Sequence, residues 1–128
     1  MEKIVFLGNA KFLSDQVKIQ KIIKKLMDKK AKDIVIIDLR NFNHITDFFI
    51  ICTCESSNHR KAVIESLEEE MKNLNISILF SDFNPLSQWN VLDLDDVIVH
   101  VFEEEARRFY DIEGLWSDAP QIKISENL

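Results

Sequence analysis

The spacing of apolar residues predicts two amphipathic helices in the first part of the chain. In residues 15–30 apolar side chains recur every three or four positions, as on one face of a helix, and Ser14 or Asp15 can cap its start. Residues 58–74 have the same spacing and follow ESSN, which offers N-cap residues. The apolar stripes contain Ile19, Ile22, Ile23, Leu26 and Met27 in the first helix, and Val63 or Ile64, Leu67, Met71 and Leu74 in the second.

Short apolar runs rich in β-branched residues predict the strands. IVIIDL at 34–39 and FFIICT at 48–53 are typical of strands buried on both faces, and ISILF at 76–80 predicts a third. WNVLDL at 89–94 alternates between apolar and polar residues. VIVHVF at 97–102 follows after a turn, so these two segments have hairpin spacing.

A last helix is expected after residue 102. The run EEEARR at 103–108 places acids at a helix N-terminus and pairs glutamates with arginines four residues later. Gly114 is typical of the left-handed residue that ends a helix. We expect Phe109 in the core and Tyr110 at its edge. The whole pattern predicts one α/β domain, with a mixed central sheet of about five strands flanked by helices.

Length and composition support a single domain in a reducing compartment. The chain has 128 residues with two glycines and two prolines, and it contains no repeat or low-complexity linker. No apolar run approaches the roughly 18 residues of a membrane span, and the first residues do not resemble a secretory signal. We therefore expect a cytoplasmic protein that does not insert into membranes.

The charges are distributed unevenly along the chain, whose net charge is −6. Residues 1–32 contain nine lysines against three acids, whereas residues 93–128 contain three basic residues against ten acids. Because phosphates would be repelled, the acidic C-terminal part argues against direct nucleic-acid readout. It favours a basic protein as the partner.

Three candidate sites have a structural and a chemical interpretation. Cys52 and Cys54 would share a strand face, either as small buried residues or as part of a metal site with a histidine, but the second ligand pair of such a site is missing. Asp93 and Asp95 could hold Mg²⁺ for nucleotidyl transfer, although the chain has no glycine-rich phosphate loop. His100, on an apolar strand, is more often a core residue than a ligand. We expect no cofactor and no metal.

Two long stretches resemble the ribosomal silencing factor family, also called the Iojap family. They are AKDIVIIDLRNFNHITDFFIICTCESSNHRKAV and WNVLDLDDVIVHVFEEEARRFYDIEGLWSDAP. The resemblance covers about residues 15–120, which leaves 1–14 as an N-terminal extension and 121–128 as a C-terminal tail. The sequence departs from the family at Cys54 and at Asp95, where the family usually has glycine, and at Asn58, where it often has arginine.

The resemblance implies a non-enzymatic homodimer whose fold is similar to the nucleotidyltransferase fold. Members of the family bind the large ribosomal subunit at a bridge-forming ribosomal protein, block joining of the small subunit and reduce translation when nutrients are short. Organellar relatives act in large-subunit maturation, so an assembly factor remains an alternative. We expect the contact surface to be lined or supported by Trp89, Asp95, Asp96, His100, Tyr110, Leu115 and Trp116. The alternative for Trp89 and His100 is a core role alone.

Overall fold

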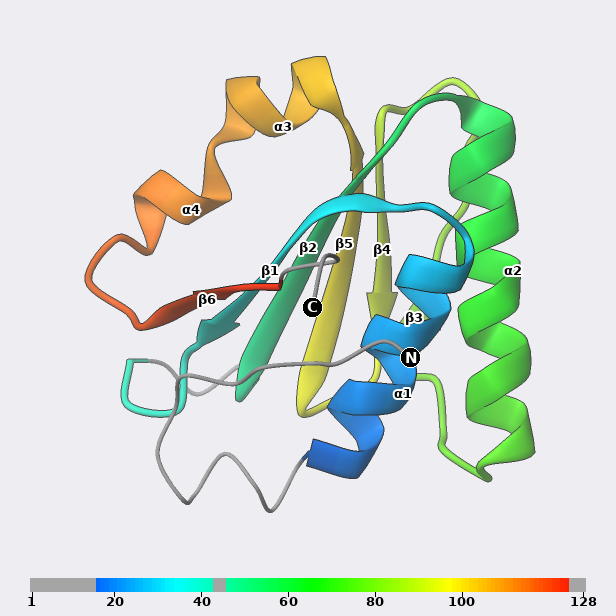
Figure 1. Ribbon diagram of the computed structural model, residues 1–128, viewed down its shortest axis with the longest axis horizontal. Helices are drawn as coiled ribbons and strands as arrows, with labels where there is room; N and C mark the ends of the chain where they lie inside the picture. Colours follow the sequence, from blue (N-terminus) through cyan, green and yellow to red (C-terminus); the bar gives the residue numbers. More distant parts are fainter. Residues whose placement is uncertain (1–15, 43–45, 125–128) are drawn as a thin grey trace.

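The computed structural model describes residues 16–42 and 46–124. Within these residues six strands form one mixed sheet in the order β3-β4-β5-β2-β1-β6 (Figure 1). The elements are α1 (Gln16–Asp28), β1 (Lys32–Asp38), β2 (Phe48–Cys54), α2 (Ser57–Asn73), β3 (Phe80–Ser81), β4 (Trp89–Asp93), β5 (Val97–Glu103), α3 (Glu104–Tyr110), α4 (Ile112–Leu115) and β6 (Gln121–Lys123). The predicted α/β class and mixed sheet are confirmed.

The centre of the sheet is the parallel pair β2 and β5, in which Ile50 lies opposite Val99 and Ile51 opposite His100. The pairs β1–β2, β1–β6, β3–β4 and β4–β5 are antiparallel. A parallel pair needs a crossover connection, and here it consists of α2, β3 and β4. Because β2 and β5 lie in the middle of the sheet, both of their faces must be covered by other elements.

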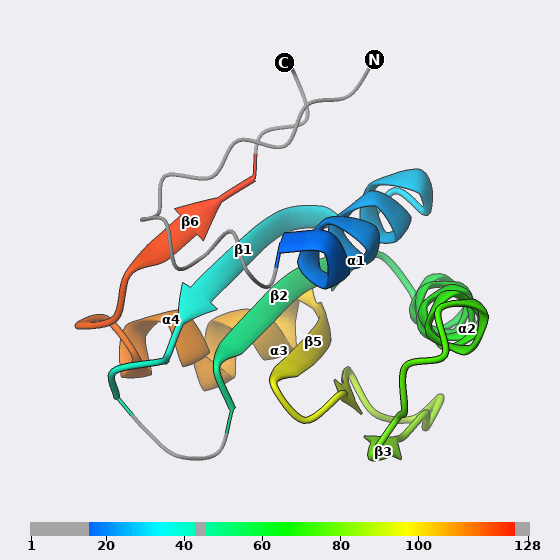
Figure 2. The same cartoon turned by 90° about the horizontal axis from the view of Figure 1, so that it is seen from below.

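Helices cover the two faces unequally (Figure 2). On one face α1 and α2 pack their apolar stripes on the strands, in a cluster that includes Cys52 and Cys54. The interpretation of these cysteines as small buried residues is therefore confirmed. On the other face the shorter α3 and α4 bury only Ala106 and Ile112 of their own side chains, against Val35, Ile37 and their neighbours. Part of this second face therefore remains accessible.

The third strand differs from the prediction. Residues 76–79 are not a strand; only Phe80 and Ser81 pair with β4, at the edge of the sheet. Ile76 and Ile78 instead pack against the α1 and α2 side of the core. Their burial satisfies the apolar pattern without strand pairing, which the pattern by itself cannot distinguish.

The sheet also extends beyond the segment in which we expected strands. Residues 121–123, which we placed in the C-terminal tail, form β6 and pair with β1, with Ile122 opposite Ile36. The expected N-terminal extension, 1–14, and the helix caps Ser14 and Asp15 lie outside the described residues. The predicted cap of the second helix is observed, because Ser56 accepts a hydrogen bond from the His59 backbone N–H.

The last helix is divided at Asp111, which corrects the prediction for Gly114. Asp111 has φ 45° and is the left-handed residue, whereas no described glycine has positive φ. The Asp111 carboxylate caps α4 by accepting a hydrogen bond from the Gly114 N–H at 3.1 Å. A Cβ at position 114 would lie 2.1 Å from Asp111 Oδ2. Glycine is therefore needed here to leave space for the cap.

One of the two expected helix pairings, Glu103–Arg107, is replaced by longer-range contacts. Arg107 pairs with Glu113 at 2.9 Å and donates to Thr53, rather than pairing with Glu103. Glu103 instead pairs with Arg60. The second expected pairing, between Glu104 and Arg108, is confirmed at 4.0 Å and is exposed.

We predict that Gly114→Ala displaces the Asp111 carboxylate and lowers the free energy of unfolding by about 1 kcal/mol, the typical cost of a lost N-cap. Urea denaturation measures this loss. Because both changes act on one cap, Asp111→Ala/Gly114→Ala should be no less stable than Asp111→Ala. Additive losses in the double variant would show that Gly114 acts independently of the cap.

Candidate functional site

An aromatic cluster occupies the incompletely covered face of the sheet. Trp89 begins β4 and lies opposite Phe102 of β5, with ring centroids 5.0 Å apart and planes 22° apart. The Tyr110 ring, at the end of α3, lies 4.7 Å from the Trp89 ring. Trp89 is half-buried and Tyr110 is 52% exposed. The structure therefore brings Trp89, Tyr110 and the neighbouring His100 together, as expected from the sequence.

His100 lies beneath this cluster and is 6% exposed. Its Nδ1 accepts a hydrogen bond from Trp89 Nε1 at 3.1 Å, so the proton of the neutral ring is on Nε2. Nε2 has no hydrogen-bond partner within the described part of the chain. The Phe49 ring packs edge-on at 4.5 Å. Burial lowers the pKa of His100 to about 4, so the ring is uncharged at neutral pH.

A groove of about 410 Å³ lies beside Trp89 and α3. One wall is the segment that leads into β4, and the other is α3. The lining residues are Ser87, Gln88, Trp89, Glu105, Ala106, Phe109 and Tyr110. The groove is lined by aromatic side chains and by the Glu105 carboxylate, which suits a protein side chain more than a phosphate.

Phe109 corrects the expectation that it would be in the core. It is 79% exposed, and its ring meets Tyr110 edge-on at 5.0 Å. Because α3 is only seven residues long and its C-cap is Asp111, Ala106 is its one buried side chain, and Phe109 faces solvent. The helical spacing of the sequence identified the apolar stripe but assigned the wrong member of it to the core.

Leu115 and Trp116 lie on the same side of the sheet at the end of α4. Leu115 is 76% exposed. Trp116 is half-buried and packs edge-on against Phe49, with centroids 6.4 Å apart. Trp116 is thus connected to the cluster through Phe49, which also contacts His100, whereas Leu115 is exposed and does not line the groove.

Asp95 and Asp96 are not part of this surface. They form the turn before β5, whereas α3 starts after the other end of this strand, roughly 20 Å away at about 3.3 Å per residue. Asp96 pairs with Lys18 of α1, and its carbonyl accepts hydrogen bonds from the backbone N–H groups of Asp47 and Phe48. The Asp96 contacts therefore stabilise the turn and connect it to α1.

The structure also does not support the possible Mg²⁺ site at Asp93 and Asp95. Asp95 lies in the turn with φ 78°, not on the strand, so the two carboxylates do not share a strand face. Asp93 Oδ1 accepts a hydrogen bond from the Asp95 N–H at 2.8 Å. Among the described residues no group of three histidine, cysteine or carboxylate side chains could hold a metal ion.

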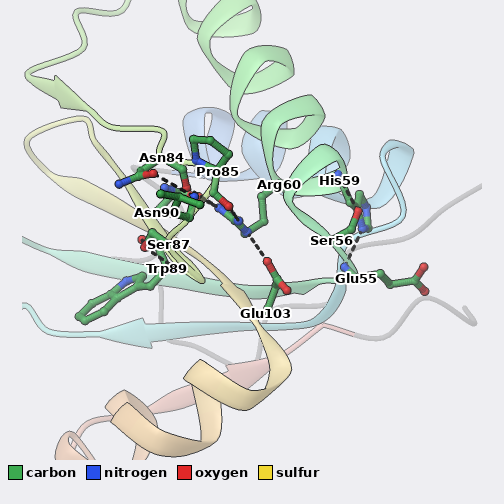
Figure 3. Close-up of polar contacts among 11 residues, drawn as sticks. Glu55, Ser56, His59, Arg60, Asn84, Pro85, Ser87, Trp89, Asn90 and Glu103 are labelled. Carbon is green, nitrogen blue, oxygen red and sulfur yellow. Dashed lines mark hydrogen bonds and ion pairs between the residues drawn. The ribbon is translucent and has the colours of Figure 1, made fainter.

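The sequence reasoning overlooked a buried arginine, Arg60. It is 0% exposed and pairs with Glu103 at 2.8 Å, directly before α3 (Figure 3). One signal was available, because Arg60 precedes Val63, Ile64 and Leu67 at the spacing of the buried stripe of α2. A charged residue on such a stripe indicates a buried partner.

We predict that His100 makes stability fall in acid. Its folded pKa of about 4 lies below the unfolded value of about 6.5, so the unfolded state binds the proton first. The contribution of His100 to the free energy of unfolding is fully present above pH 6.5 and is lost as the pH falls toward 4. The loss is about 2 kcal/mol at pH 5. Urea denaturation of the wild type and His100→Leu at pH 7.5 and 5 should show that the variant lacks this part of the loss. Equal pH dependence in both proteins would contradict the prediction.

The tautomer can be tested separately. Two-dimensional ¹⁵N NMR of the imidazole should show a neutral ring protonated on Nε2 at pH 7, because Trp89 Nε1 can only donate. A ring protonated on Nδ1 would exclude the hydrogen bond from Trp89.

Comparison with known proteins agrees with this architecture. Residues 13–128 match the family described as "RsfS: Ribosomal silencing factor during starvation". The chain is 32% identical over 112 residues to "Ribosomal silencing factor RsfS" of Halalkalibacterium halodurans, covering 88% of this chain and 96% of the relative. It is 32% identical over 93 residues to the protein of that name from Bacillus subtilis, covering 73% and 79%.

A solved structure supports the same assignment. The crystal structure of a Chromobacterium violaceum protein superimposes with a TM-score of 0.74 at 32% identity, over 79% of this chain and 85% of that one. None of the helices described here is long and apolar enough to cross a membrane. The family match over nearly all of the sequence, together with these relatives, shows that the chain belongs to the ribosomal silencing factor family.

Proposed function

We propose that this protein binds the large ribosomal subunit in the cytoplasm and blocks its association with the small subunit. The contact is made through the aromatic groove to a basic, bridge-forming ribosomal protein, without catalysis, cofactor or metal. Membership of the ribosomal silencing factor family supports the ribosomal role. The observation that carries the choice of surface is the exposure of Phe109 and Tyr110 at the groove.

Large exposed apolar side chains of this kind suit a protein partner. Phe109 and Tyr110 present their rings at the groove, and Trp89 forms part of its lining. Aromatic side chains are rigid and bury a large area when they are covered, so they contribute most of the affinity in many protein interfaces. The neutral, buried His100 below them allows the cluster to pack without a charge that would need solvation.

Charge around the groove supports a basic partner. Glu104 and Asp111 are exposed at the two ends of α3, and Glu105 lines the groove itself. Complementary charges at the rim of an interface mainly raise the association rate, while the apolar centre determines the lifetime of the complex. Asp95 and Asp96, at the distant turn, are left out of the proposed contact. We also propose that the protein acts as a homodimer, as the family resemblance implies.

Gradient sedimentation tests the proposed function. Purified protein is mixed with isolated large subunits, isolated small subunits or joined ribosomes, and subunit joining is measured in parallel. We expect binding to free large subunits and inhibition of subunit joining. Joined ribosomes should not bind the protein, because the bridge protein is already covered by the small subunit. Binding without inhibition would favour a role in large-subunit assembly, and absence of binding would exclude both roles.

We predict that Tyr110→Ala and Phe109→Ala each weaken binding to large subunits by about 2–4 kcal/mol, or roughly 30- to 1,000-fold. The reason is that each removes an exposed aromatic anchor at the groove. Binding is measured by co-sedimentation at a series of protein concentrations. Phe80→Ala is the matched control, since Phe80 is 55% exposed on β3 at the sheet edge.

Circular dichroism must show that the variants remain folded. If Phe80→Ala reduces binding as much as Phe109→Ala does, the docking surface lies elsewhere. Trp116→Ala is less specific, because this half-buried residue also supports Phe49.

We also predict a salt-dependent effect of charge. Glu104→Lys/Glu105→Lys should slow association about tenfold at low ionic strength, because the rim would repel a basic partner. The difference should shrink at high salt, since exposed charges are screened. Stopped-flow mixing with labelled large subunits measures the rate. Glu65→Lys/Glu69→Lys, which changes two exposed acids on α2, is the control and should have little effect.

A further inference from the structure

We propose that Arg60 is the positioning residue of the aromatic groove, holding its two walls at the spacing that the partner requires. What the groove binds rests on the function proposed above. Arg60 itself does not line the groove and is 0% exposed. It therefore would act through the segments that it connects.

The Arg60 guanidinium contacts the 84–90 segment and Glu103, which directly precedes α3 (Figure 3). Its Nε donates to Glu103 Oε2 at 2.8 Å, at the end of β5. Its Nη1 donates to Asn90 Oδ1, and to the Asn84 carbonyl at 3.4 Å. Its Nη2 donates to the Pro85 carbonyl at 3.4 Å. One planar group from α2 thus joins the 84–90 segment to the start of α3.

These two segments are the walls of the groove. Residues 84–90 lead into β4 and provide Ser87, Gln88 and Trp89. Glu103 is the N-cap residue of α3, which provides the opposite wall. The Glu103 side chain makes no capping hydrogen bond. Its carboxylate bonds Arg60 instead, and its backbone N–H donates to the Gln88 carbonyl at 2.9 Å.

The buried hydrogen-bond network of Arg60 is not an efficient way to stabilise the fold. It places a cation in the interior and leaves Asn90 Nδ2 without a hydrogen-bond partner among the described residues. Buried ion pairs can often be replaced by apolar residues of similar volume without loss of stability. What such a network can add is a defined geometry, because its bonds are directional. The groove is the feature whose geometry these bonds define.

Arginine has a shape that lysine cannot reproduce here. Its planar group presents donors in several fixed directions, so it can contact Glu103 and Asn90 together. The Phe83 ring lies 5.4 Å from the guanidinium carbon and packs against it. A lysine could pair with one of the two polar partners, and the other would be released.

The test uses two readouts, one of which needs no partner. The chain has two tryptophans, so in a Trp116→Phe background Trp89 is the single fluorescent reporter of the groove wall. Acrylamide quenching then measures how well Trp89 is shielded. Co-sedimentation with large subunits measures affinity, at a temperature where thermal unfolding shows each variant to be folded.

Arg60→Lys is expected to make Trp89 more accessible to acrylamide and to weaken large-subunit binding about tenfold. The variant Arg60→Met/Asn90→Leu/Glu103→Gln removes the buried cation and the Asn90 amide and neutralises the partly exposed Glu103 carboxylate. It should unfold at or above the wild-type temperature, yet retain the weaker binding and greater quenching. If stability is recovered but binding affinity and shielding of Trp89 are not, Arg60 positions the groove and does not simply stabilise the fold.

Arg40→Lys is the matched control. Arg40 also forms a two-pronged pair, with Asp38 at 2.7 and 2.9 Å, but it follows β1 and does not border the groove. The Arg40→Lys variant should leave both Trp89 quenching and large-subunit binding unchanged. The inference is overturned if Arg60→Lys leaves Trp89 quenching and binding at wild-type values, or if the triple variant binds as the wild type does. If the wild type fails to bind large subunits, the proposed function is lost, while the quenching data still decide the role of Arg60.

Discussion

The parallel pairing of β2 with β5 is the constraint on which the rest of the structure depends. It places two almost fully apolar strands at the centre of the sheet, so both faces have to be covered. On one face α1 and α2 do this with their apolar stripes, except that Leu74, predicted in the second stripe, is the C-cap of α2 and is 36% exposed. On the other, two short helices separated at Asp111 cover only part of the strands. The aromatic surface proposed to bind a ribosomal protein is the part that they leave accessible.

Two buried polar residues near the exposed aromatic side chains, His100 and Arg60, avoid leaving an unpaired charge there. His100 is neutral and accepts a hydrogen bond from Trp89, so it occupies an apolar position at a modest energetic cost. Arg60 is charged, but a carboxylate and several oxygens surround it. The two residues affect the same region by different means. His100 supports the Trp89 ring from beneath, whereas Arg60 connects the backbone segments on either side of the groove.

The candidate site was predicted from the sequence only in part. Trp89, His100 and Tyr110 were expected near one another, and the structure brings them together because β4 and β5 pair in the predicted hairpin and α3 follows directly. The quoted stretches were also sufficient to identify the family. Phe109 and Arg60 were assigned wrongly or overlooked, since neither the exposure of a helix residue nor a distant ion-pair partner can be read from local spacing. Asp95 and Asp96 were grouped with the aromatics because an acidic edge suits a basic partner, but the length of β5 separates them.

The sequence by itself determined α1, α2, the central strands and the hairpin, because periodicity and capping act over a few neighbouring residues. It also determined that residues 93–128 are acidic and that Phe109, Tyr110 and Trp116 lie close together in this segment. Tertiary structure decided that β6 pairs with β1, that Ile76 and Ile78 are buried without forming a strand, and that Glu103 pairs with Arg60. It also decided which of Ala106 and Phe109 faces the sheet. These outcomes depend on contacts between residues far apart in the chain, whose free energy exceeds the weak local preferences of each segment.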